Sequence, residues 1–73
     1  MRRPRRDLAG ILAGIAARQA EHANDDKMRF YAEGTVLGAW SALMRIASPR
    51  EQVGLDAVWD RWQAFVRDAG RAA

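Results

Sequence analysis

The chain has 73 residues and a formal net charge of +3, so it has room for one small domain. It has no cysteine, which excludes disulfides and thiolate metal sites. The excess positive charge comes from four residues near the N-terminus: Arg2, Arg3, Arg5 and Arg6. Without them, eight basic residues face nine acidic ones. We therefore expect a basic N-terminal arm, residues 1–6, followed by a single helical domain, residues 7–73.

The first predicted element is a helix over residues 8–23, with Asp7 as its N-cap. Its large apolar residues fall on one face at the helical spacing: Leu8, Ile11, Leu12 and Ile15. A stripe of small residues flanks that face: Ala9, Ala13, Ala16, Ala20 and Ala23. Because alanine has a short side chain, this stripe predicts that a neighbouring helix comes close.

A second helix is predicted over residues 26–47, after a turn formed by Asn24, Asp25 and Asp26. Its apolar residues cover more than half of the helix circumference: Met28, Ala32, Val36, Leu37, Ala39, Trp40, Leu43, Met44 and Ile46. A helix that is apolar over most of its surface is buried on more than one side. We therefore expect this helix to be the central element and to take part in a homodimer.

A capping box marks the next helix start. Ser48 suits the N-cap, Pro49 suits the first helical position, and Glu51 is placed to bond back to the cap. Pro49 also disfavours the helical conformation at Ser48, which ends the preceding helix.

The segment that follows is expected to divide at Gly54. Residues 49–53 are predicted to form a short helical turn and residues 55–70 the third helix, with Gly70 as its C-terminal cap. The apolar face of this helix is regular: Leu55, Val58, Trp59, Trp62, Phe65, Val66 and Ala69. The predicted fold class is thus all-α, a small three-helix unit that forms a dimer.

Two pairs of glycines lie four residues apart inside the predicted helices, Gly10 with Gly14 and Gly34 with Gly38. Glycine inside a helix costs about 1 kcal/mol relative to alanine, so four of them need a reason. Two interpretations stay open. The pairs allow a second helix–helix contact, within the chain or between chains, or they lie on exposed faces without a role.

Six aromatic side chains are a large number for one small core. Tryptophan and tyrosine are enriched at the energetic centres of interfaces, although aromatic residues at helical spacing are also typical of a core. We predict a partner or dimer interface formed by these and neighbouring apolar residues: Phe30, Tyr31, Leu37, Trp40, Met44, Trp59 and Trp62.

Residues 53–62 resemble the turn and second helix of a helix-turn-helix DNA-binding motif, with Gly54 in the turn and Asp56 as a cap. The resemblance places the motif within residues 49–69 and implies nucleic-acid contacts by Arg61 and Arg67. The sequence departs from the motif at Pro49, which leaves the first helix short. A second route to nucleic acid is the arm, whose arginines can each neutralise a phosphate: Arg2, Arg3, Arg5 and Arg6.

Metal, catalytic and membrane signals are weak. His22 with Asp25 and Asp26 is too small a ligand set for zinc, and neither a nucleophile with a nearby base nor a phosphate-binding loop is present. We expect no enzyme and no cofactor. The apolar stretch over residues 28–47 contains charged residues, so we expect no membrane span and a cytoplasmic protein.

These observations favour a non-enzymatic helical protein–protein interaction module that occludes or bridges a macromolecular partner. Arginine outnumbers lysine eleven to one, which indicates a gene of high GC content. A small helical protein from such a source fits a regulator or inhibitor encoded by a phage or mobile element. The expected partners are the chain itself and a macromolecule, protein being favoured over nucleic acid. The alternative function is nucleic-acid binding.

Overall fold

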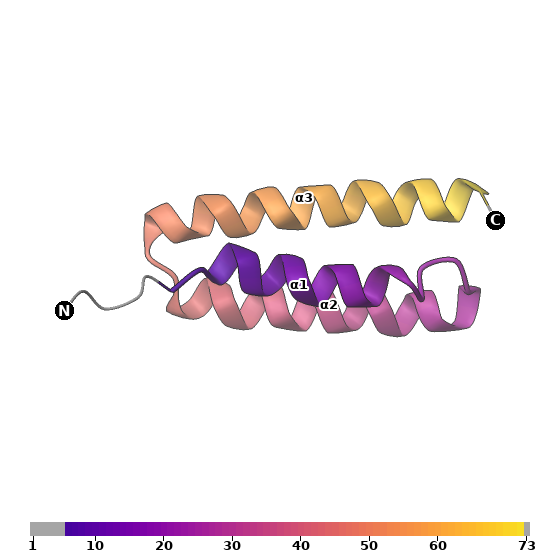
Figure 1. Cartoon of the computed structure of the whole chain (residues 1–73), viewed down its shortest axis with the longest axis horizontal. Helices are drawn as coiled ribbons and strands as arrows, with labels where there is room; N and C mark the ends of the chain where they lie inside the picture. The colour runs from indigo at the N-terminus through magenta and orange to yellow at the C-terminus, as the bar shows by residue number, and fades with distance from the viewer. Residues whose placement is uncertain (1–5, 73) are drawn as a thin grey trace.

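A computed structural model describes residues 6–72, which form three helices: α1 (Leu8–Ala20), α2 (Asp26–Ile46) and α3 (Pro49–Ala72). Helices α1 and α3 begin at the same end of the bundle, and α2 runs in the opposite direction (Figure 1). Each helix packs against the other two. The predicted all-α, three-helix unit is confirmed, and no strand occurs within residues 6–72.

Local capping sets where the first two helices begin. Oδ1 of Asp7 accepts a hydrogen bond from the backbone N–H of Gly10 at 2.8 Å, as expected of an N-cap. Oδ1 of Asp25 likewise accepts from the N–H of Lys27 at 3.0 Å and caps α2. The prediction that the first helix reaches residue 23 is wrong. It ends at Ala20, where the backbone passes into i→i−3 bonds that tighten the chain into a turn.

The capping box at the start of α3 is confirmed. The N–H of Ser48 donates to Oε1 of Glu51 at 2.9 Å, and the N–H of Glu51 donates to Oγ of Ser48 at 3.2 Å. Both bonds join residues three positions apart, so the local sequence is enough to specify them.

The predicted break at Gly54 is wrong, because α3 is one continuous helix of 24 residues. A Cβ on Gly54 would lie 3.3 Å from the Cβ of Ala9, so the glycine leaves room for α1 to pack closely. The predicted C-terminal cap at Gly70 is also not formed, since α3 continues to Ala72 and no glycine has positive φ within residues 6–72. Without a turn at Gly54, the helix-turn-helix predicted within residues 49–69 does not form.

The core lies along the axis between the three helices and consists of Leu8, Leu12, Ala32, Val36, Leu55, Val58, Trp62 and Val66. Most of the predicted alanine stripe of α1 packs against it, namely Ala9, Ala13, Ala16 and Ala20. Helix α2 is not the central element that the sequence predicted. Only two of its residues are fully enclosed, Ala32 and Val36. The rest of its apolar arc is divided between residues that pack partly buried against the core, Ala39, Trp40, Leu43 and Met44, and residues that stay exposed, Met28, Leu37 and Ile46.

Candidate interaction surface

The side of α2 that faces away from α1 and α3 carries large apolar side chains. Phe30 is 75% exposed, Tyr31 68% and Leu37 45%. The two aromatic side chains alone present roughly 200–350 Å² of accessible area, if each ring offers roughly 150–250 Å² in full. At 100° per residue these side chains share one face with small and basic residues. We call this surface the outer α2 face: Lys27, Phe30, Tyr31, Gly34, Leu37, Gly38, Ser41 and Arg45.

The glycines of the outer α2 face, Gly34 and Gly38, have open space beside them in the described structure. Apart from its chain neighbours and the backbone of its own helix, a Cβ placed on Gly34 or Gly38 would meet no atom within 4 Å in the described structure, and the same holds for Gly14 on α1. Of the two interpretations of the glycine pairs, the contact between helices of the same chain is therefore ruled out at these three positions. Gly10 differs, because a Cβ there would clash with Oδ2 of the capping Asp7.

A groove of about 340 Å³ runs between α2 and α3 along the edge of the outer α2 face, lined by Phe30, Glu33, Gly34, Leu37, Trp59 and Gln63. Trp59 stacks on Trp40 with ring centroids 4.9 Å apart and an interplanar angle of 19°. This stack packs against the core, and the Trp59 ring forms one wall of the groove. Its remaining lining includes Phe30, which is mostly exposed.

The residues predicted to form an interface fall into three groups. Phe30, Tyr31 and Leu37 lie on the surface. Trp40, Met44 and Trp59 are partly buried and pack against the core. Trp62 is only 4% exposed and belongs to the core itself. Sequence reasoning missed Glu33 and Gln63 at the groove, which carry no signal beyond their polarity. It also missed Val53, which is 71% exposed on α3.

A second, smaller groove of about 240 Å³ lies between α1 and α3 and is lined by Ala13, Ala16, Ala17, Ala20, Val58, Arg61, Trp62 and Phe65. It follows from the alanine stripe, whose short side chains leave space beside the rings of α3. Its floor is made of core residues such as Val58 and Trp62. Unlike the α2–α3 groove, it has no largely exposed aromatic side chain, since Phe65 is 42% exposed.

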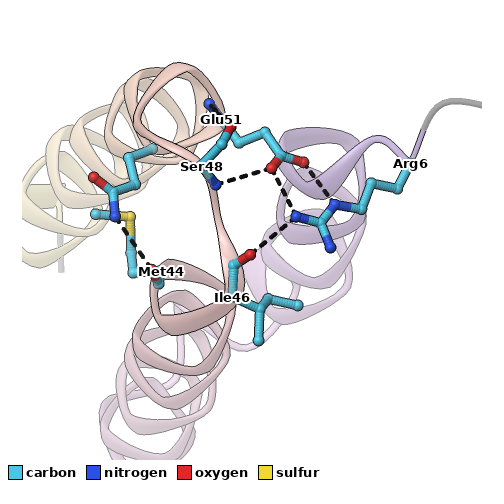
Figure 2. Close-up of polar contacts among 6 residues, drawn as sticks. Arg6, Met44, Ile46, Ser48 and Glu51 are labelled. Atoms are coloured by element: carbon cyan, nitrogen blue, oxygen red, sulfur yellow. Dashed lines mark hydrogen bonds and ion pairs between the residues drawn. The ribbon is translucent and has the colours of Figure 1, made fainter.

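Arg6, which the sequence analysis assigned to the arm, is bonded to the junction between α2 and α3. Its Nε donates to Oε2 of Glu51 at 2.8 Å, and its Nη2 donates to Oε1 of Glu51 at 2.8 Å and to the carbonyl of Ile46 at 2.9 Å (Figure 2). Nε2 of Gln52 reaches the carbonyl of Met44 at 3.4 Å. These donors satisfy carbonyl groups that the end of α2 leaves without helical partners.

Of the other predicted nucleic-acid contacts, the structure describes Arg61 and Arg67, and these two do not share one face of α3. Arg2, Arg3 and Arg5 lie outside the described residues. Arg61 and Arg67 are both exposed on α3, but six positions along a helix place them about 120° apart around its axis. Arg61 and Arg67, both predicted to contact nucleic acid, thus lie on separate faces of α3.

The ion pair with Arg6 gives a prediction for pH dependence. The hydrogen bond from Arg6, followed by that from the N–H of Ser48, lowers the pKa of Glu51 from 4.5 to about 2. A carboxylate whose pKa is lowered by folding adds stability above its ordinary pKa, and this is lost as the pH falls toward the folded value. We expect the Tm of the native chain to fall more than that of Glu51→Gln between about pH 6 and about pH 3.

The measurement is a thermal melt followed by circular dichroism at both pH values. Asp56→Asn is a suitable control, because Asp56 is an exposed carboxylate elsewhere on α3. Between the two pH values, the Tm of Asp56→Asn should fall by as much as the Tm of the native chain. Equal losses of Tm for the native chain and Glu51→Gln would contradict the ion pair.

Within residues 6–72, His, Cys, Asp and Glu side chains nowhere gather in groups of three or more that could hold a metal ion. None of the three helices is long and apolar enough to cross a membrane. Comparison of the chain with protein-family models, curated proteins and solved structures finds no significant match.

Proposed function

We propose that this chain is a non-enzymatic protein–protein interaction module whose binding surface is the outer α2 face together with the α2–α3 groove. The observation that carries the proposal is the exposure of Phe30, Tyr31 and Leu37 on one side of a helix whose opposite side forms the core. Exposed apolar patches of a few hundred Å² on small proteins are often binding sites. Aromatic side chains are also the usual energetic centres of such sites.

The partner is a protein rather than a nucleic acid, and self-association into a homodimer is one of its modes. A continuous α3, and an Arg6 already bonded to Glu51, take support away from the nucleic-acid alternative. The chain acts in the cytoplasm as a small regulator or inhibitor, of phage or mobile-element origin, by occluding or bridging its target. It acts by burying surface against its target and catalyses no reaction.

The test is sedimentation velocity of the native chain, Phe30→Ser and Val53→Ser over a range of micromolar concentrations. Phe30 and Val53 are matched in exposure, 75% and 71%, but lie on different helices. We expect the native chain and Val53→Ser to associate alike, and Phe30→Ser to associate at least about tenfold more weakly. A native chain that stays monomeric, or a Phe30→Ser variant that associates as well as Val53→Ser, would contradict the proposal.

A further inference from the structure

The outer α2 face combines large exposed side chains with glycines that have open space beside them. Phe30 projects one turn before Gly34, and Leu37 lies beside Gly38, so bulky side chains alternate with positions where no side chain is present. Neither glycine is filled by any neighbour in the described structure. A second α2 running antiparallel can place its projections over these gaps, which is the ridge-into-groove packing that brings helices close together.

We infer that two copies of the chain pair through antiparallel α2 helices, with Gly34 on the two-fold axis. This inference rests on the proposed function and names its partner. A two-fold axis brings together side chains on the same flank of the contact, so Phe30 lies beside Leu37 of the second copy and Tyr31 lies over Gly38 of the second copy. The two Gly34 residues face each other, where the absence of side chains permits the closest approach of the helices.

Charge favours this register over the neighbouring antiparallel register, in which the two glycine pairs face each other. Centring the pair midway between Gly34 and Gly38 would set Lys27 opposite Arg45 of the second copy. Centring it on Gly34 sets Lys27 opposite the uncharged Ser41 instead. Arg45 then lies just beyond the start of the second α2. There it is two or three residues, about 3–5 Å along the helix axis, from Asp25 and Asp26 of the second copy.

Those aspartates are available to a second copy. Both are exposed, and the side chain of Asp26 is 81% exposed even though it bonds to Arg29 of its own helix. A parallel pair of α2 helices would instead place Lys27 against Lys27 and Arg45 against Arg45. Like charges that face each other across helices are unfavourable, so the antiparallel pair centred on Gly34 is the arrangement that the charges support.

The expected dimer is of moderate strength. A standard stable interface takes about 800 Å² from each partner. The two exposed aromatic side chains supply roughly 200–350 Å² of this, and the rest must come from Leu37, the backbone near the glycines and the rim of the groove. We therefore expect association in the micromolar range.

Cysteine cross-linking tests the register directly, because the native chain has no cysteine. A single introduced thiol can therefore form a disulfide only with the same position in a second chain. A disulfide requires Cα atoms within about 7 Å, which Gly34→Cys meets on the two-fold axis. Gly14→Cys is the matched control, since it too is a helical glycine with open space around it. We expect Gly34→Cys to form dimers under mild oxidation at least about tenfold faster than Gly14→Cys.

Charge reversal provides a second measurement that leaves the glycines untouched. In the proposed register Arg45→Glu faces the aspartates of the second copy and should weaken dimerisation by about threefold to tenfold, whereas Lys27→Glu should change it little. In the alternative register either substitution creates an opposite-charge pair and strengthens the dimer. A mixture of Gly34→Cys and Gly38→Cys should yield mostly Gly34 homodimers.

Different results would contradict the register, the α2 pairing and the proposed function. Preferred cross-linking of Gly34→Cys to Gly38→Cys, or a stronger dimer of Lys27→Glu, would overturn the register while association through Phe30 stands. A native dimer in which Gly34→Cys reacts no faster than Gly14→Cys, whether alone or mixed with Gly38→Cys, would overturn the α2 pairing altogether. A native chain that remains monomeric at every concentration would overturn both.

Discussion

Replacing Trp62 by alanine is expected to lower the free energy of unfolding by about 3–5 kcal/mol. The side chain is 4% exposed and belongs to the core, so its removal leaves a cavity that α1 and α2 cannot fill. Domains of this length have a total stability of roughly 4–11 kcal/mol at 0.05–0.15 kcal/mol per residue. The variant should therefore melt far below the native chain, or be unfolded at 37 °C, when followed by circular dichroism.

Phe30→Ala is the matched control, because it removes another aromatic ring from a position that is 75% exposed. Measured at a concentration where the chain is monomeric, it should change the stability by no more than about 0.5 kcal/mol. Trp62→Phe should cost less than Trp62→Ala. It keeps a ring in the core and removes a buried Nε1–H that has no hydrogen-bond partner in the described structure. Equal effects of Phe30→Ala and Trp62→Ala would show that the core is misassigned.

Combining Gly14→Ala, Gly34→Ala and Gly38→Ala is expected to stabilise the monomer by about 2–3 kcal/mol. Each glycine lies inside a helix, where alanine is favoured by about 0.8–1 kcal/mol, and each added methyl group enters open space. The three added methyl groups share no contact partner, so their effects should be nearly additive. The Tm should rise by roughly 10–20 °C.

Two other glycines serve as controls for this gain. Gly10→Ala should gain much less, because its Cβ would clash with Oδ2 of Asp7 and disturb the cap of α1. Gly54→Ala is opposed by Ala9, whose Cβ would be 3.3 Å away. The melts should be recorded at two protein concentrations. The gain of the monomer does not depend on concentration, whereas any weakening of association at Gly34 and Gly38 does. An unchanged Tm in the triple variant would contradict the helical, open setting of these glycines.

Several elements followed from the sequence because their causes are local. The caps at Asp7 and Ser48 each depend on a hydrogen bond between residues three positions apart, so residue type and spacing are sufficient to predict them. The start of α2 at Asp26 and the alanine stripe of α1 are predictable for the same reason, since helical periodicity is set by neighbours along the chain.

Other features depend on how the helices meet, which no local pattern contains. Gly54 is of a residue type that often ends helices, yet it lies inside the continuous α3, where α1 packs close to it at Ala9, 45 positions earlier. The bond between Arg6 and Glu51 spans the same separation. Helical periodicity places both Phe30 and Trp62 on apolar faces. How much of such a face becomes buried depends on how closely the neighbouring helices approach it. Only the packing of three helices decided that Trp62 is enclosed and that Phe30 remains on the surface for a partner.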